Sequence, residues 1–181
     1  MTITWIQAIL FGLLACLASM PGMGGTAIGN YTLGRPLVAG LIVGLIVGDV
    51  STGIMVGAAI QVIYIALVTP GGTVSADVRA ISYIGIPLSI AAIKGLGIDP
   101  STVEAAQMAA ALGAAVGTLG TVLFYGTATM NLVWQHIGWK AVEKGDFKKL
   151  YAVDMILPWI SHILFSFIPT LIITKMGAKI G

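Results

Sequence analysis

Long apolar stretches, separated by isolated charges and by short turns rich in glycine or proline, run along the whole chain. The first 34 residues carry no charge and divide into an apolar helix over about 3–20 and a glycine-rich loop, MPGMGGTAIGNYTLGRP. Crossing a bilayer takes about 20 largely apolar residues in a helix. Residues 1–20 begin without a basic segment, so they predict a retained first membrane helix and not a cleaved signal peptide.

Short and long apolar runs alternate in the middle of the chain. Residues 36–48 and 80–93 are short stretches between charges, and Pro87 interrupts the second, whereas the stretch from Asp49 to Pro70 is long enough to span. Broken helices survive at membrane depth only where they are buried in protein or line an aqueous cavity, and transporters use them to bind substrates. Channels share the pattern. We therefore predict an all-α polytopic membrane protein that contains short re-entrant or broken helices.

The second half of the chain is more uniformly apolar. Residues 105–139 carry no formal charge, and one straight helix of that length would measure about 50 Å, well beyond a hydrocarbon core of about 30 Å. We expect it to turn or to lie partly in the interface, and we predict a break at the stretch YGTATMN. Residues 140–154 form the one strongly polar loop, and residues 155–174 form a last helix kinked at Pro158 and Pro169.

Composition supports a single membrane domain over residues 1–181. Hydrophobic residues make up 57% of the chain and charged residues 9%, against about a quarter charged in soluble domains. The net charge of +2 is dispersed, which gives no basic tract for nucleic acid. The lone cysteine, Cys16, excludes an intrachain disulfide and is expected to be a packing residue.

Lysines and small residues add two expectations. The basic loop at 140–154 is predicted to be cytoplasmic, because the positive-inside rule counts lysine and arginine; a single crossing by 155–174 would then put Lys175 and Lys179 outside. Small residues at four-residue spacing allow close approach of helices, and a sliding surface is the alternative role; they are Gly40, Gly44, Gly48, Gly53, Gly57, Gly113 and Gly117.

Motifs for catalysis are absent from the sequence. His136 and His162 lie far apart, each near a tryptophan, so interfacial or packing roles are expected for both. GMGGTAIG does not continue into the Lys-Ser/Thr of a phosphate loop, and no Gly-x-Ser-x-Gly occurs. We expect no metal, no cofactor and no catalytic phosphoryl-transfer residue.

Four polar side chains lie among the apolar runs: Asp49, Gln61, Asp77 and Arg79. Such groups usually face a cavity or a partner, because a charge at the bilayer centre costs about 3 kcal/mol or more. Asp49 would otherwise end a short helix, and Asp77 with Arg79 would otherwise form a capped or exposed turn. Gln61, expected well inside a spanning segment, would either join helices or hydrogen-bond a polyol.

Several of these residues belong to a recognisable series of motifs. RPLV at 35–38, GD at 48–49, TGIMVGAAIQ at 52–61 and PGGTVSAD at 70–77 together resemble the membrane component IIC of the mannose–fructose–sorbose family of bacterial phosphotransferase systems. The resemblance is clear over residues 1 to about 95. The glucose and mannose branch has Glu where this chain has Gln61, which leaves a sorbose-like or amino-sugar-like substrate open.

The resemblance implies a function and an assembly. Component IIC, paired with a second membrane component, IID, carries a sugar across the bacterial inner membrane, and cytoplasmic IIB, recharged by IIA, phosphorylates it. It also implies an elevator-like core, expected at residues 35–95, on an oligomeric scaffold, as in a trimer of IIC–IID pairs. Family members are longer by several helices, so either a partner completes the fold or these residues are part of a longer chain.

The resemblance also implies a site. Gln61 and Asp77 would bind sugar hydroxyls beside the backbone of Gly71, Gly72 and Thr73, where glycine lets N–H groups reach a ligand. Structural or gating roles are open for Arg35, Asp49 and Arg79. Two other functions remain as alternatives: an intramembrane scaffold that docks a partner through its glycine faces, and an intramembrane enzyme, for which the sequence offers no nucleophile–base pair.

Overall fold

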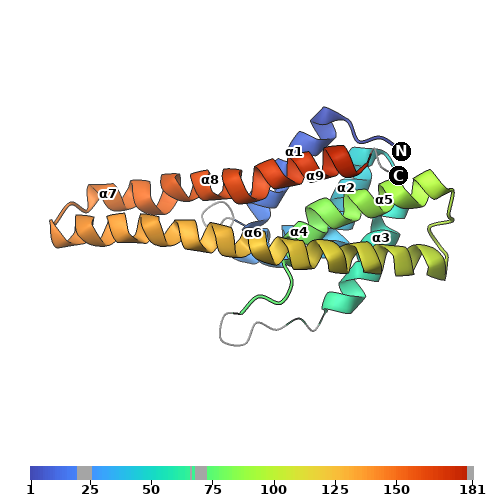
Figure 1. The fold of residues 1–181 in the computed structure, drawn as a ribbon, viewed down its shortest axis with the longest axis horizontal. Helices are drawn as coiled ribbons and strands as arrows, with labels where there is room; N and C mark the ends of the chain where they lie inside the picture. Colours follow the sequence, from blue (N-terminus) through green and yellow to red (C-terminus); the bar gives the residue numbers. More distant parts are fainter. Residues whose placement is uncertain (20–25, 66, 68–72, 179–181) are drawn as a thin grey trace.

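The described part of the chain is helical, as predicted. The computed structural model describes residues 1–19, 26–65, 67 and 73–178 (Figure 1). Its elements are α1 (Trp5–Ser19), the π-helical η2 (Thr26–Leu33), α2 (Pro36–Val47), α3 (Val50–Tyr64), α4 (Val78–Ala80), η4 (Ile81–Gly85), α5 (Ile86–Leu96), α6 (Val103–Glu143), α7 (Lys148–Tyr151), η5 (Ala152–Ile156), α8 (Leu157–His162), η6 (Ile163–Phe167) and α9 (Ile168–Gly177).

Three continuous helices within these residues are long and apolar enough to cross a membrane: Val78–Leu96, Val103–Glu143 and Lys148–Gly177. The last two form an antiparallel hairpin whose far end extends beyond the other helices (Figure 1). At about 1.5 Å per residue, the 41 residues of α6 reach about 60 Å. One half of the hairpin packs on the bundle and the other half forms a protruding arm.

The turn predicted at YGTATMN is therefore wrong. No proline occurs between Pro100 and Pro158, and the small residues of this stretch make a contact face instead. A Cβ on Gly126 would lie 2.6 Å from the ring of Phe165 in the opposite helix. The polar loop predicted at 140–154 also shrinks to a turn, because α6 continues to Glu143 and helix resumes at Lys148.

Each proline inside a long helix follows a π-helical turn. Pro87, Pro158 and Pro169 occupy the second position of α5, α8 and α9, and five-residue π-helical segments η4, η5 and η6 immediately precede these helices. Proline lacks an N–H and crowds the carbonyl four residues earlier. A wider turn accommodates both effects without ending the helix. At Pro158 and Pro169, where kinks were predicted, the helix therefore continues through a π-helical turn.

The apolar stretches before and after Pro70 differ from the prediction in length. Helix α3 has 15 residues and ends at Tyr64, so it is too short to span alone. The stretch predicted as short, 80–93, instead belongs to the 19-residue helix Val78–Leu96. That helix includes Arg79 and Lys94, because each of these cations is paired with an aspartate.

Helices α2 and α3 form a tight hairpin along their glycine faces, as the spacing predicted. A Cβ on Gly40 would collide with the carbonyl oxygen of Gly53 and lie 2.9 Å from the Cα of Gly57. A Cβ on Gly44 would lie 2.9 Å from the Cα of Val50. Gly48 ends α2 with φ +79°, a conformation that glycine adopts without strain. The faces are thus used for close backbone packing.

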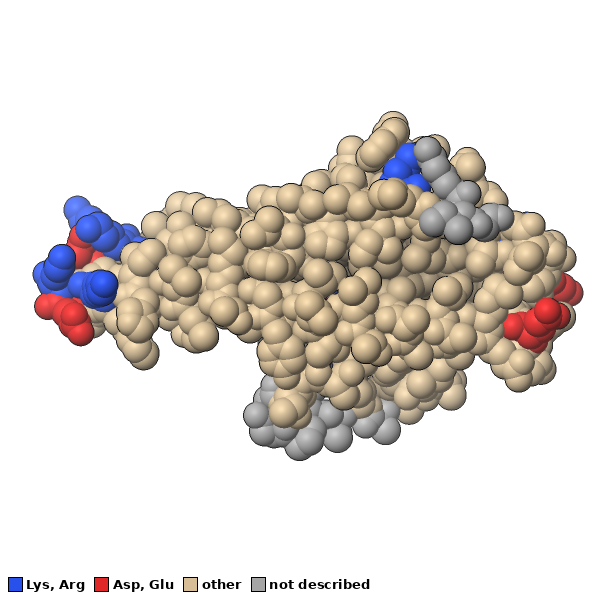
Figure 2. Space-filling model, viewed as in Figure 1, with Lys and Arg blue, Asp and Glu red and all other residues tan. Residues whose placement is uncertain are grey.

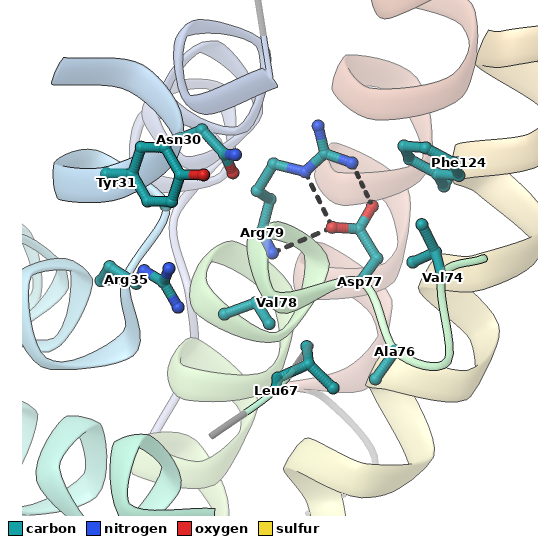
Figure 3. A pocket seen from close by; sticks show the side chains of 11 residues that line it. Asn30, Tyr31, Arg35, Leu67, Val74, Ala76, Asp77, Val78, Arg79 and Phe124 are labelled. Atoms are coloured by element: carbon teal, nitrogen blue, oxygen red, sulfur yellow. Dashed lines mark hydrogen bonds and ion pairs between the residues drawn. The ribbon is translucent and has the colours of Figure 1, made fainter. Parts of the chain in front are cut away.

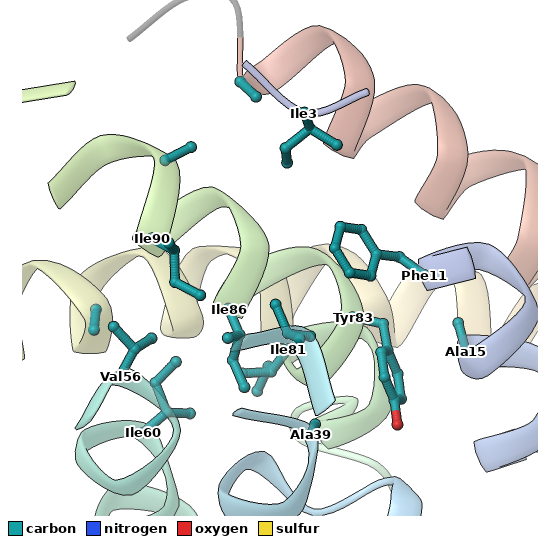
Figure 4. Packing of buried hydrophobic residues seen from close by; sticks show 14 of the residues in the cluster. Ile3, Phe11, Ala15, Ala39, Val56, Ile60, Ile81, Tyr83, Ile86 and Ile90 are labelled. Atoms are coloured by element: carbon teal, nitrogen blue, oxygen red, sulfur yellow. The ribbon is translucent and has the colours of Figure 1, made fainter. Parts of the chain in front are cut away.

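The buried core surrounds η4 and α5, in which every residue from Ile81 to Pro87 is buried (Figure 4). The Tyr83 hydroxyl donates to the carbonyl of Leu33 at 2.7 Å, and the Ser82 hydroxyl donates to the carbonyl of Gly34 at 3.0 Å. These bonds hold the end of η2 against the core. Part of the predicted glycine-rich loop is thus helical, and its residues 20–25 lie outside the described ranges.

The outer surface is apolar over most of its length. Large side chains such as Ile6, Val62 and Val122 are more than two-thirds exposed. Figure 2 shows charged side chains at the two ends of the long axis and one further basic group on the upper edge. A surface of this kind is stable in contact with lipid or with another protein, but not in contact with water.

Candidate functional site

A pocket of about 380 Å³ lies where η2, the segment before α4, and α6 meet (Figure 3). Its described lining is Asn30, Tyr31, Gly34, Arg35, Leu67, Val74, Ala76, Asp77, Val78, Arg79 and Phe124. The volume is in the range of small-molecule sites. Three of the residues singled out in the sequence, Arg35, Asp77 and Arg79, are thus brought to one place.

Asp77 and Arg79 form a nearly buried ion pair at this pocket. Arg79 Nε donates to Asp77 Oδ1 at 2.9 Å and Nη2 donates to Oδ2 at 3.4 Å. The same Oδ1 accepts from the Arg79 backbone N–H at 3.0 Å and so caps α4. The side chains are 10% and 18% exposed. Asp77 is therefore both a helix cap and an electrostatic partner, and both oxygens of its carboxylate accept hydrogen bonds.

Helix α6 supports the segment that carries Asp77. The Asp77 backbone N–H donates to the carbonyl of Gly117 at 3.1 Å, and the Tyr125 hydroxyl accepts from the Val74 N–H at 3.2 Å. A Cβ on Gly120 would lie 2.6 Å from the Cβ of Ala80. The segment before α4 can reach α6 this closely because the facing residues of α6 are glycines.

Arg35 lines the pocket separately from the ion pair (Figure 3). It is the N-cap residue of α2, where its side chain makes no cap hydrogen bond because a guanidinium has no acceptor atom. Its guanidinium lies over the Tyr31 ring, 5.4 Å from the centroid, and that of Arg79 lies over the Phe124 ring at 5.2 Å. Each guanidinium lies over one aromatic ring, a position in which the ring attracts a cation, and that of Arg79 also donates to Asp77.

The other predicted site residues are not brought to this pocket. Gln61 lies three residues before the end of α3, so its expected place deep inside a spanning segment is wrong. Its Oε1 is buried and has no hydrogen-bond partner among the described residues. Thr73 is exposed and is not part of the described lining. Gly71 and Gly72 lie outside the described residues.

Asp49 performs a structural task elsewhere. It caps α3, accepting from the Thr52 N–H at 3.1 Å and the Thr52 hydroxyl at 2.7 Å, and it pairs with Lys94 at 2.8 Å. Hydrogen bonds from Lys94 and Thr52 lower the pKa of Asp49 to about 2. It begins a helix, whereas the alternative considered from the sequence was that it ends one.

Asn30, Tyr31 and Phe124 were missed from the sequence. Asn30 and Tyr31 belong to a segment interpreted as a loop, and Phe124 lies midway along an apolar helix. The available signal was weak: an Asn-Tyr pair just before the RPLV motif. Only the tertiary structure, in which η2 packs against α1 and α2, places Asn30 and Tyr31 in the same pocket as Phe124.

The histidines and the cysteine act in packing, or at the surface. Cys16 is 1% exposed, and its thiol donates to the carbonyl of His162 at 3.4 Å. His162 is buried, whereas His136 is exposed with its ring centroid 5.6 Å from that of Trp139. In the ranges that the structure describes, no three metal-ligating side chains are grouped.

Broken apolar helices around a charged pocket define a polytopic helical membrane protein, an architecture that transporters and channels share. The family model described as the sorbose-specific IIC component of the phosphotransferase system matches residues 5–181. The chain belongs to this family of IIC components, as its motifs indicated.

The chain is similar to three characterised classes of IIC component. It is 30% identical over 146 residues to a mannose-specific EIIC component of Escherichia coli K12, covering 81% of this chain and 50% of that protein. It is 29% identical over 150 residues to a sorbose-specific EIIC component of Klebsiella pneumoniae, covering 83% and 51%. It is 29% identical over 167 residues to a fructose permease IIC component of Bacillus subtilis, covering 92% and 58%.

The fold is also found in a solved structure. A chain in the complex of the mannose transporter ManYZ with microcin E492 superposes with a TM-score of 0.72 at 23% identity, over 99% of this chain and 66% of that one. The present chain spans about half the length of the mannose and sorbose relatives that it matches.

Proposed function

We propose that this chain is the sugar-translocating IIC subunit of a phosphoenolpyruvate-dependent phosphotransferase system in the bacterial inner membrane. It acts with a IID membrane subunit, and cytoplasmic IIB, recharged by IIA, phosphorylates the sugar. The observation that carries the proposal is the pocket at Arg35, Asp77 and Arg79, which is a charged cavity in an otherwise apolar chain. A pure scaffold would need no such cavity, and charges at these positions would be costly without a purpose.

The sugar is held beside the segment that precedes α4. Asp77 fixes Arg79, and Arg35, Tyr31 and Asn30 contribute further polar groups to the lining. Gln61, Gly71, Gly72 and Thr73 complete the site when the sugar is bound. The buried, unpartnered Oε1 of Gln61 supports this role, because an acceptor of that kind is costly unless a donor reaches it.

Transport proceeds by movement of a core, residues 35–95, against a scaffold of IIC–IID pairs assembled as a trimer. The close glycine packing of α2 on α3 supports movement of the two helices as a unit. The energy comes from phosphate transfer, so no proton need accompany the sugar.

The test is uptake and phosphorylation of hexoses, hexosamines and ketoses in cells that carry the complete system. Uptake of one class that requires this chain supports the proposal, and its absence for every sugar contradicts it. Gln61→Ala should reduce both uptake and sugar affinity, whereas Gln107→Ala, at an exposed position of α6, is the matched control. Unchanged affinity in Gln61→Ala would remove Gln61 from the site.

A further inference from the structure

We infer that the far end of the hairpin formed by α6 and the helix Lys148–Gly177 binds the headgroups of anionic phospholipids. This hairpin tip comprises residues 139–151, from the end of α6 through the turn to the end of α7. The inference is independent of the sugar pocket. It is carried by the change from apolar to basic side chains at the tip, by the exposed aromatic rings there and by the length of the hairpin.

Both helices of the hairpin change from apolar to charged at the same level. Residues 105–139 carry no formal charge, and apolar side chains such as Leu132 on α6 and Ile156 on the returning helix are exposed just before the tip. A Cβ on Gly138 would lie 3.2 Å from the Val153 side chain, so these two positions are neighbours across the hairpin. An apolar outer surface therefore ends on both helices where the tip begins.

The tip carries a surplus of positive charge. It contains four lysines and two acidic residues, for a net charge of +2, and Figure 2 shows charged side chains gathered at this end of the long axis. Lys149 pairs with Asp146 at 3.1 Å. Lys140, Lys144 and Lys148 are exposed and form no ion pair within the ranges that the structure describes. Three ammonium groups are thus available to an external anion.

Exposed aromatic rings lie among these lysines. Trp139, Phe147 and Tyr151 are 66%, 66% and 67% exposed. Tryptophan and tyrosine are enriched at membrane–water interfaces, where their rings lie at the level of the headgroups. Lysine reaches the same level because its long stem lies along apolar surface while its ammonium group stays in the polar layer. Exposed rings and lysines together favour a lipid surface over a purely aqueous or acidic partner.

The length of α6 supports this placement of the tip. The charge-free residues 105–139 measure about 50 Å along the helix, against about 30 Å of hydrocarbon core. A helix longer than the core tilts, and interfacial tryptophan, tyrosine and lysine side chains help to set its tilt. Each lysine near an anionic membrane surface strengthens attraction about fivefold. The phosphodiester groups of anionic lipids would thus supply the counter-charge and hold the tip at the interface.

The lipid composition around the tip tests the inference on the purified chain in nanodiscs. A bimane fluorophore on Val142→Cys, at an exposed position of the tip, is quenched by brominated phosphatidylglycerol or brominated phosphatidylcholine, each diluted in phosphatidylcholine. We expect phosphatidylglycerol to be enriched about tenfold or more around this position. Val103→Cys, at the opposite end of α6, should show no enrichment. The enrichment at the tip should decrease as ionic strength rises.

Paired substitutions assign the enrichment to the lysines. Lys144→Gln with Lys148→Gln should reduce the enrichment to about twofold or less, and Lys144→Arg with Lys148→Arg should preserve it. Val103→Glu with Gln107→Glu changes the net charge by the same amount at exposed positions of the opposite end, and it should leave the enrichment at the tip unchanged. Thermal unfolding verifies that each variant folds; if the glutamine pair does not fold, the dependence on ionic strength decides.

Three outcomes overturn the inference: equal amounts of the two lipids around Val142→Cys, equal enrichment at both ends of α6, or enrichment that persists in the glutamine pair or at high ionic strength. A fourth result would assign the tip to a protein partner instead. That result is binding of the purified cytoplasmic IIB subunit to the wild type but not to the glutamine pair, without enrichment of phosphatidylglycerol.

Discussion

Arg79 binds both carboxylate oxygens of Asp77 from a position only two residues further along the chain. The carboxylate also caps the helix that begins at Val78. One side chain thus fixes both the start of a membrane helix and the direction of a guanidinium that lines the pocket. Asp77 therefore links the start of this helix to the shape of the pocket.

Asp77→Asn should weaken binding of the transported sugar roughly tenfold, because the variant keeps the helix cap but no longer fixes Arg79. Charge-assisted hydrogen bonds contribute about 1.5–3 kcal/mol, against about 0.5–1.5 for neutral ones. Binding is measured by calorimetry on the purified protein, and the amount of each variant in the membrane is compared with that of the wild type. Asp146→Asn, at the hairpin turn, is the control. Transport should stay coupled to phosphorylation. Normal affinity would reduce Asp77 to a cap, since Asn also caps turns.

Tyr83→Phe should lower the free energy of unfolding by about 1–2 kcal/mol, because it leaves the Leu33 carbonyl without its hydroxyl donor. The same bond holds the end of η2, which carries Tyr31, so sugar affinity should fall several-fold. Tyr151→Phe, at a position 67% exposed, should change neither quantity. Equal stability of the two variants in denaturant titration would contradict this account of how η2 is anchored.

Gly40→Ala should destabilise the protein by about 1–3 kcal/mol, the usual cost of overpacking, because the new methyl group meets the backbone of α3. Gly113→Ala is the matched control: its Cβ would lie 3.4 Å from the Ile60 side chain, an ordinary contact. Thermal unfolding in detergent measures both. A loss as large in Gly113→Ala would show that backbone approach is not the cause.

Acidification should remove the contribution of the Asp49–Lys94 pair. The pKa of Asp49 is lowered in the folded protein from 3.8 to about 2, so the stabilisation is complete above about pH 4 and is lost as the pH falls towards 2. For a partly exposed pair we expect about 1 kcal/mol or less. Asp49→Asn should unfold at a lower temperature than the wild type at pH 6, and the two midpoints should converge only as the pH falls to about 2 and below. A constant difference would exclude titration of Asp49 as the cause.

Lys144→Cys should react with a membrane-impermeant maleimide only from the cytoplasmic side, as the positive-inside rule predicts. Gly145 is a poorer position for the cysteine, because its φ of +69° disfavours a side chain. Val103→Cys, 73% exposed at the opposite end of α6, should react only from outside. The native Cys16 is buried, which keeps background labelling low. Reaction of Lys144→Cys from outside would reverse the topology.

The sequence by itself determined the class of protein, the glycine packing faces and the family. A charged fraction of 9% cannot cover a water-exposed surface, a glycine every fourth residue places bare backbone on one helix face, and the family motifs are contiguous. These are properties of composition or of neighbouring residues, which local physics controls. The sequence also indicated where Pro158 and Pro169 would perturb the last helix.

Only the tertiary structure decided where helices continue and which residues share the pocket. The stretch at YGTATMN stays helical because Gly126 packs against Phe165, a partner far away in sequence. The helix Val78–Leu96 includes two cations because distinct aspartates pair with them. Arg35 reaches the same pocket as Asp77 and Phe124 because Tyr83 and Ser82 hold the η2–α2 junction against the core. Each of these results depends on contacts between residues distant in sequence, which hydrophobic pattern and helix length do not encode.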